Sequence, residues 1–265
     1  MNNPSVTVLI PNLNGCRYLR ESVLSALRQD YFCDVLVVDN GSSDDSLKIL
    51  NELENKFSNF RYIVESKRGI VQALNTGLKN ISTDYVARLD SDDIMKPNRI
   101  SKQINCFSEN TSLILLGSAI ENIDECGNLK SITKYPGRHE LILKSLQYRN
   151  TFAHPSVMFK TNIVKQVGLY RSEFEGAEDL DLWLRLINKG QLGNIDEPLT
   201  KYRIHSNQVT LLNNYYKIEL KVRINWLINN YRYNDGLNYL LIALRLIDLF
   251  LVSRNFKLHR KLIKR

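Results

Sequence analysis

Three carboxylates, Asp90, Asp92 and Asp93, stand within four residues of one another, directly after an apolar run. Acids this close repel one another unless a cation neutralises them. Oxygen-rich clusters suit Mg²⁺ or Mn²⁺, whose coordination is completed by water and substrate phosphates. The alternative is an acidic N-cap for a helix that begins near Pro97. The position of the triplet at a strand end favours the cation site.

A further acid, Asp39, closes another apolar run and is followed by Gly41, Ser42 and Ser43. A turn rich in glycine and serine exposes backbone N–H groups and lets a ligand approach closely. In such a site Asp39 would accept a hydrogen bond from a base or a ribose. A plain strand-to-helix turn with Ser43 or Asp44 as N-cap explains the same residues.

The third acidic segment is a helix expected over residues 176–186. At about 100° per residue, Asp179 falls on the apolar face of this helix. Asp181 falls beside Arg185 and predicts a surface ion pair, and Glu178 stands in the first turn, where the helix dipole favours an acid. A partly desolvated carboxylate has a raised pKa and suits a general base, so Asp179 is the candidate.

His154 and His205 lie in polar surroundings. A lone histidine is most often a hydrogen-bonded structural residue, and a metal-ligand role is the alternative for each.

The segments that must position these residues show two hydrophobic spacings in turn, one typical of strands and one typical of helices. Strands are expected at 6–10, 35–38, 62–64 and 85–89, and helices at about 17–29, 44–56 and 69–80. A helix from Pro97 to about 109, a strand at 113–120 and a hairpin within 121–135 follow. This alternation predicts an α/β fold with a mostly parallel sheet flanked by helices. Ligands of such sheets bind at the carboxyl ends of the strands, where the polar loops after the first, second and fourth strands converge.

Composition predicts a globular chain, because 43% of its 265 residues are hydrophobic and 24% are charged. Four widely separated cysteines argue against a cysteine zinc site and a disulfide framework, and fit a reducing cytoplasm. The N-terminus lacks the features of a signal peptide, and no apolar stretch of spanning length is present.

The formal charge of +8 belongs to the C-terminal end. Residues 1–214 hold 25 basic and 25 acidic residues, whereas residues 215–265 hold 11 and 3. Because a nucleic-acid enzyme spreads positive charge over its working face, no nucleic-acid partner is expected.

Residues 236–252 are mainly apolar with a narrow polar stripe, and six basic residues without an acid follow. This pattern favours contact with an anionic membrane surface over a helix packed on the domain. Residues 218–226 fit a strand or a helix, and we expect a helix.

Together these segments resemble the inverting, type-A fold glycosyltransferases of family 2. The matching stretches, in that family's order over about residues 5–207, are VLIPNLN (8–14), VVDNGSSD (37–44), ALNTG (73–77), RLDSDD (88–93), HPSV (154–157), EDLDLW (178–183) and YRIH (202–205). The resemblance implies a Rossmann-like catalytic domain that binds a nucleotide-sugar, with a UDP-linked donor and Mn²⁺ or Mg²⁺. It also implies a lipid-linked saccharide acceptor in bacterial surface polysaccharide synthesis, such as O-antigen or capsule. We expect this domain to span residues 1–210, a helical, basic region to span 211–265, and the protein to lie on the cytoplasmic face of the membrane.

Residue roles follow from the same resemblance, position by position. It implies a nucleoside pocket lined by Pro11, Asn12, Asn14 and Asp39, with Asp39 facing the base, and it places Ser91 among the residues that bind the nucleotide-sugar. Asp90 would lie near the ribose and the metal, Asp92 would be the principal metal ligand, and His205 would complete the metal site. Asp179 would be the catalytic base, and Glu178 would support the acceptor side.

Two positions depart from the family pattern. The family often has an acid where this chain has Asn40, a change that alters loop contacts at most. Arginine often precedes Asn75 in relatives, but here the residue is Leu74, so a phosphate or base contact is expected from Arg68 instead.

Two other functions remain open at this stage. A nucleotidyltransferase shares the sheet and the acidic metal site, but the chain lacks a glycine-rich, basic phosphate loop after the first strand. A non-catalytic sugar-nucleotide-binding module is the other alternative, and the presence of Asp39, the acidic triplet and Asp179 together argues against it.

Overall fold

The computed structural model describes residues 3–146, 148–205 and 216–231. Its first half alternates strands and helices: β1 (Val6–Asn12), α1 (Cys16–Leu27), β2 (Asp34–Asp39), α2 (Ser46–Glu54), β3 (Phe60–Val64), α3 (Ile70–Lys79) and β4 (Tyr85–Arg88). These four strands pair in parallel in the order β3-β2-β1-β4. Each strand expected from an apolar run is therefore present.

The second half adds β5 (Ile94–Met95), α4 (Arg99–Glu109), β6 (Leu113–Ile123), β7 (Leu129–Thr133), α5 (His139–Leu146), β8 (Met158–Lys160), α6 (Thr161–Gln166), α7 (Glu178–Leu186) and β9 (Gln191–Arg203). Two 3₁₀ helices, η1 (His154–Ser156) and η2 (Ser172–Phe174), lie between them. The sheet continues from β4 through β8, β6 and β9 to β5. The expected hairpin is the antiparallel pair β6–β7.

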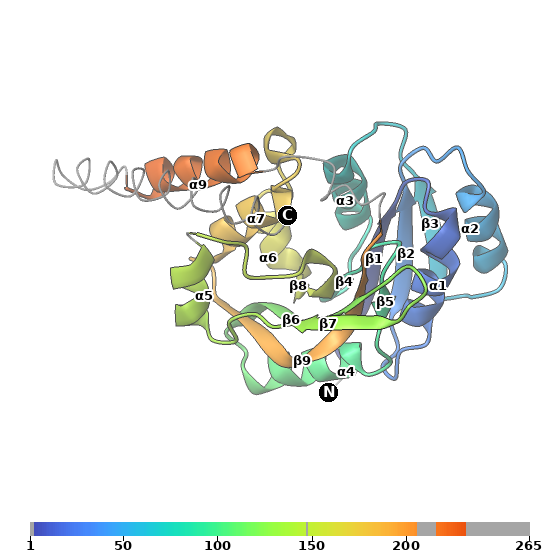
Figure 1. The fold of residues 1–265 in the computed structure, drawn as a ribbon, viewed down its shortest axis with the longest axis horizontal. Coiled ribbons are helices and arrows are strands. Elements are labelled where there is room, and N and C mark those ends of the chain that lie inside the picture. The colour runs from blue at the N-terminus through green and yellow to red at the C-terminus, as the bar shows by residue number, and fades with distance from the viewer. Residues whose placement is uncertain (1–2, 147, 206–215, 232–265) are drawn as a thin grey trace.

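The sheet is mixed, but its long pairings, β1–β2, β2–β3 and β6–β9, are parallel. This confirms the predicted α/β fold with a mostly parallel central sheet. Figure 1 shows the blue N-terminal units at one end of the molecule and α5, α6, α7 and α9 at the other, with the long β9 curving between them.

Successive side chains of the buried strands point to opposite faces of the sheet, so each strand contributes to two hydrophobic cores. Leu9, Leu36 and Val38 belong to a cluster that includes residues of α3 and α7. Val8 and Ile10 belong to a second cluster, which includes residues of α1, α2 and α4. Burial on both faces explains why these strands are continuous apolar runs, and it fixes their carboxyl ends at one edge.

The helix α9 (Tyr216–Tyr231) confirms the helical interpretation of residues 218–226. It contacts α7 and η2, and buries Val222 and Leu227. The amphipathic stretch 236–252 and the basic end lie outside the described residues. In the part of the chain that the structure describes, no helix is long and apolar enough to cross a membrane.

Candidate active site

The first two polar loops meet at the ends of β1 and β2, where Asn12 lies opposite Asp39 in the parallel register. Asp39 is wholly buried. Its Oδ1 accepts from Asn12 Nδ2 at 2.8 Å and from Ser42 Oγ at 2.6 Å, and its Oδ2 accepts from the Ser42 N–H at 2.9 Å. Asp39 therefore orients Asn12 and the serine turn. Pro11, beside them, is buried.

Asn14 is exposed and adopts a positive φ of 52°. Its N–H donates to Ser42 Oγ at 2.8 Å, and its Oδ1 accepts from the Ser43 N–H at 2.8 Å. Helix α2 begins at Ser46, whose N–H donates to Asp44 Oδ1 at 3.0 Å. The expectation of Ser43 or Asp44 as the N-cap is wrong, because the N-cap residue is Asp45 and it forms no side-chain cap bond.

Asn40, one of the two departures from the family pattern, holds the next loop in place. Its Nδ2 donates to the carbonyls of Glu65 and Lys67 at 3.2 and 2.8 Å, and its Oδ1 accepts from the Gly69 N–H at 2.7 Å. An aspartate has no N–H to donate to two carbonyls, so the amide fits this position better than an acid. Arg68 stands exposed on this loop, which leads into α3.

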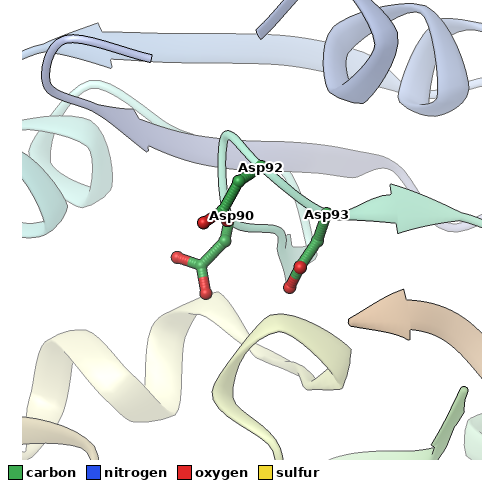
Figure 2. A group of neighbouring side chains, drawn as sticks. All are labelled: Asp90, Asp92 and Asp93. Atoms are coloured by element: carbon green, nitrogen blue, oxygen red, sulfur yellow. The ribbon is translucent and has the colours of Figure 1, made fainter. Parts of the chain in front are cut away.

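The third loop carries the acidic triplet between β4 and β5. Figure 2 shows Asp90, Asp92 and Asp93 with their carboxyl groups turned to the same side of the loop. One oxygen of each lies within 4.8 Å of the others. The loop lies next to the first one, because a Cβ on Gly15 would stand 3.0 Å from Ser91 Oγ and 2.3 Å from Asn12 Oδ1.

Each carboxylate of the triplet has one partner. Asp90 pairs with Arg88, His205 Nε2 lies 2.8 Å from Asp92 Oδ2, and the Arg203 N–H donates to Asp93 Oδ1 at 2.8 Å. Among the described residues, the buried Oδ2 of Asp93 has no hydrogen-bond partner. His205 follows β9, so the structure brings it to the acidic loop over 113 positions of sequence.

Electrostatics at this loop fit a divalent cation. Burial, and then the charge of Asp90, raises the pKa of Asp92. Burial, and then the charges of Asp92 and Asp90, raises the pKa of Asp93 well above its ordinary range. A cation would neutralise this excess negative charge, and two carboxylates beside an imidazole nitrogen form a donor set that Mn²⁺ or Mg²⁺ accepts.

The alternative reading of the triplet as an acidic helix cap is wrong. Helix α4 begins at Arg99, its N-cap residue is Asn98, and no side-chain cap bond is formed there. Strand β5 separates the acids from this helix along the chain.

Helix α7 presents Glu178 and Asp179 at its N-terminus. Glu178 is buried, and its Oε2 accepts from the Gly176 N–H at 2.7 Å. Asp179 is half-buried; its Oδ1 accepts from the Leu180 N–H and its Oδ2 from Asn150 Nδ2, both at 2.6 Å. Burial raises the pKa of Asp179, while burial and then the charge of Asp179 raise the pKa of Glu178 to about 7.

The prediction of a surface ion pair at Asp181 is wrong in its location. Asp181 does pair with Arg185 at 2.9 Å, but it also pairs with Arg171, and its side chain is only 3% exposed. The helix projection assumed one solvent face, whereas α7 contacts α6, η2 and α9. The pair therefore supports the fold from inside.

His154 is half-buried, and its Nε2 lies 2.8 Å from Tyr170 Oη. Burial, and then the nearby charge of Arg88, lowers the pKa of His154 well below its ordinary value. These contacts favour the structural interpretation of this histidine.

Sequence reasoning missed Arg88, a buried arginine that links the two acidic groups. It pairs with Asp90, and its positive charge lowers the pKa of Asp93, Glu178 and Asp179 against the opposing effect of burial. The acidic loop and the start of α7 thus share one electrostatic environment. A charged residue that ends an apolar strand, as in the sequence YVARLD, was the available signal.

An acid-rich loop after β4 and a pair of carboxylates at the start of a buried helix, on a sheet of this order, match what the family resemblance implies for a glycosyltransferase of the type-A fold. Two solved structures share this fold: S. aureus TarS 1–349 in complex with UDP-GlcNAc, and the mannosyltransferase PcManGT from Pyrobaculum calidifontis in complex with GDP-Man and Mn²⁺. The first has a TM-score of 0.73 at 18% identity over 95% of this chain and 73% of that one. The second has a TM-score of 0.64 at 16% identity over 96% and 72%.

Sequence comparison gives the family. The profile of glycosyl transferase family 2 matches residues 7–168. The O-antigen biosynthesis glycosyltransferase WbnJ of Escherichia coli is 34% identical over 198 residues, which cover 72% of this chain and 76% of that protein. The chain belongs to glycosyl transferase family 2, as its motifs indicate.

Proposed function

We propose that the protein transfers a sugar, with inversion, from a UDP-linked donor to a hydroxyl of a lipid-linked saccharide in surface polysaccharide synthesis, O-antigen or capsule. The observation that carries this proposal is the acidic loop after β4, where one oxygen each of Asp90, Asp92 and Asp93 lies within 4.8 Å of the others and His205 Nε2 lies 2.8 Å from Asp92 Oδ2. Sugar transfer needs a cation beside the leaving diphosphate and a separate carboxylate for the acceptor hydroxyl, and Asp179 at the start of α7 suits the second role.

The donor site consists of the loops that follow β1, β2, β3 and β4. The residues that bind the nucleotide-sugar are Pro11, Asn12, Asn14, Asp39, Arg68, Asp90 and Ser91. Because both oxygens of Asp39 accept hydrogen bonds from Asn12 and Ser42, Asp39 acts on the nucleoside by fixing these neighbours. Exposed Arg68 supplies a positive charge toward the diphosphate. A UDP-sugar complex of TarS and the fold shared with it support a nucleotide-sugar in this place.

A divalent cation, Mn²⁺ or Mg²⁺, would be held by Asp92, Asp90 and His205. When bound, it stabilises the negative charge that develops on the leaving diphosphate. The proximity of these three residues and the raised pKa of Asp92 support the assignment. The Mn²⁺ complex of PcManGT is consistent with it.

Asp179 is the base that activates the acceptor hydroxyl in this proposal. A direct displacement with inversion needs one carboxylate to take the proton of the attacking hydroxyl, and no covalent intermediate. Asp179 is half-buried and held through both oxygens, which leaves lone pairs for that proton. Burial, and then the charge of Asp179, raises the pKa of Glu178 to about 7, and Glu178 supports the acceptor side.

A cytoplasmic, peripheral position on the inner face of the membrane completes the proposal. WbnJ, an O-antigen biosynthesis glycosyltransferase, supports a part in surface polysaccharide synthesis, and a lipid-linked acceptor in that synthesis would place the protein at the membrane. The apolar stretch 236–252 and the basic residues after it would contact anionic lipid.

The test is a panel of UDP-, GDP- and dTDP-sugars incubated with the protein, lipid-linked saccharide acceptors and Mn²⁺ or Mg²⁺. Transfer from a UDP-sugar with an inverted anomeric centre in the product supports the proposal. Release of pyrophosphate with formation of a sugar nucleotide would identify a nucleotidyltransferase instead, and binding without turnover would identify a binding module. The Asp179→Asn variant is the control for adventitious hydrolysis.

A further inference from the structure

Asn150 donates a hydrogen bond to the candidate base. Its Nδ2 lies 2.6 Å from Asp179 Oδ2, and the Leu180 N–H donates to the other oxygen at the same distance. Asn150 belongs to the segment between α5 and η1, 29 positions from its partner. The two donors approach different oxygens, so together they fix the plane of the carboxylate.

The segment that carries Asn150 is itself held from two sides. Thr151 is fully buried, and its carbonyl accepts from Asn194 Nδ2 of β9 at 3.1 Å. The ring of Phe152 lies 5.6 Å from that of Trp183 on α7. Asn150 Oδ1 also accepts from the Phe152 N–H at 3.3 Å. The amide is therefore presented to Asp179 by a fixed backbone.

Because several groups act on the pKa of Asp179 in opposite directions, the hydrogen bond from Asn150 affects its ionisation. Burial and the charge of Glu219 on α9 raise the pKa of Asp179, while the Leu180 N–H, Asn150 and the charge of Arg88 on β4 lower it. The remaining titratable neighbours are Glu178 on the same helix, Tyr135 after β7 and Tyr170 before η2. A base for neutral pH must stay ionised against burial, and a donor to the charged form favours ionisation.

We propose that Asn150 is a positioning residue that orients the Asp179 carboxylate toward the acceptor hydroxyl and keeps it ionised. This inference rests on the proposed role of Asp179 as the base. It assigns a function to the segment before η1 that none of the sequence motifs carries.

Two variants separate this role from simple support of the loop. Asn150→Asp keeps the side-chain volume and the acceptor for the Phe152 N–H, but replaces the donor with a like charge. Asn150→Ala removes both contacts. We expect each variant to lower kcat by roughly tenfold to a hundredfold, the range for a hydrogen bond to a charged group, with little change in the KM for the donor.

The pH profile of kcat, at saturating donor and metal, is the decisive readout. We expect the acidic limb to move to higher pH by about one unit in Asn150→Ala, and further in Asn150→Asp. Asn194→Ala is the control, because it removes a hydrogen bond to the same segment but no contact with Asp179. We expect this variant to have a lower melting temperature and an unchanged acidic limb in the pH profile of kcat.

The outcomes are distinct. Wild-type kinetics for Asn150→Asp, or a loss of activity that is equal at all pH values, would overturn the positioning role. Asp179→Asn, measured alongside, tests the assignment of the base: full activity of that variant would remove the base and this inference with it. An inactive Asp179→Asn together with an unshifted Asn150→Asp would remove the inference alone.

Discussion

At the scale of single residues, this site is built mostly from side chains whose hydrogen bonds are already satisfied by the protein. Asp39, Asn40 and Asp92 are each held by groups more than 20 positions away in sequence or on another loop. Preorganised groups need little rearrangement when a ligand binds, which is how a polar site lowers the free energy of a charged transition state.

Replacing Asp179 by Asn should remove most turnover and leave donor binding nearly intact. The amide of the variant has no basic oxygen to take the proton of the acceptor, while the nucleotide loops stay unchanged. General-base removal lowers rates by about 10²–10⁴-fold. The measurement is kcat together with UDP affinity by calorimetry, with Glu173→Gln at an exposed position as control. Activity equal to that of the wild type would end the assignment.

Replacing Asp92 by Ala should abolish the metal dependence of UDP binding. The variant loses the carboxylate that lies against His205 and that would hold the cation, so the positive charge that would favour a bound diphosphate is lost. Titration of UDP with and without Mn²⁺ measures this, and Asp196→Ala, at an exposed side chain, is the matched control. Tight UDP binding that still responds to Mn²⁺ would contradict the assignment.

Glu178 allows a prediction on stability and pH. Its pKa is raised from 4.5 to about 7 by burial and by Asp179, so the native state binds this proton more tightly than the unfolded chain. The stabilisation is complete below about pH 4.5 and is lost as the pH rises through 7.

Glu178→Gln removes that dependence and keeps an acceptor for the Gly176 N–H. We expect the variant to be more stable than the wild type by on the order of 1–3 kcal/mol at pH 8 and nearly equal to it at pH 5. Urea unfolding at the two pH values measures the difference. A variant that is less stable at pH 8 would show that the ionised Glu178 is compensated in the native state.

At the scale of elements, the sequence predicted what is local and failed where distant parts meet. The strands at Val6–Asn12 and Asp34–Asp39 were predictable because burial on both faces makes them continuous apolar runs. Strand β9 was not, because Asp196, Glu197 and Pro198 interrupt its pattern; its pairing with β6 shifts register at this point. The acidic triplet is visible in four consecutive residues, but the Asn150–Asp179 contact exists only after folding.

Arg99 holds three such elements together, and its loss should be costly. It is wholly buried, and its guanidinium donates to the carbonyls of Arg88, Pro155 and Val157 and to Thr200 Oγ1, at 2.7–3.1 Å. Arg99→Met leaves these carbonyls without their donor in a buried place.

We expect Arg99→Met to lower the free energy of unfolding by about 2–4 kcal/mol, because several buried acceptors lose their donor, measured by urea denaturation. Lys102→Met on the same helix removes only an exposed pair with Glu197 and should cost less than about 1 kcal/mol. If the two variants unfold at the same urea concentration, the carbonyls around Arg99 find other partners and the strand ends are held by packing alone.

At the scale of the whole molecule, charge is divided between two regions. The 25 acids and 25 bases of residues 1–214 cancel, while residues 215–265 carry the whole excess of +8. Helix α9 extends the catalytic core through Val222 and Leu227. A cut after residue 233 therefore separates the core, with α9 retained, from the apolar stretch and the basic end.

Truncation after residue 233 should abolish binding to vesicles that contain anionic lipid and preserve transfer to a water-soluble acceptor analogue. Each basic residue near an anionic surface contributes about 1 kcal/mol, screened by salt, and six of them follow residue 253. Vesicle sedimentation at low and high salt measures the binding. A full-length variant with these six residues changed to Gln isolates charge from apolar contact: partial, salt-insensitive binding assigns the remainder to residues 236–252. Equal sedimentation of the truncated and full-length proteins would place any membrane contact on the catalytic core.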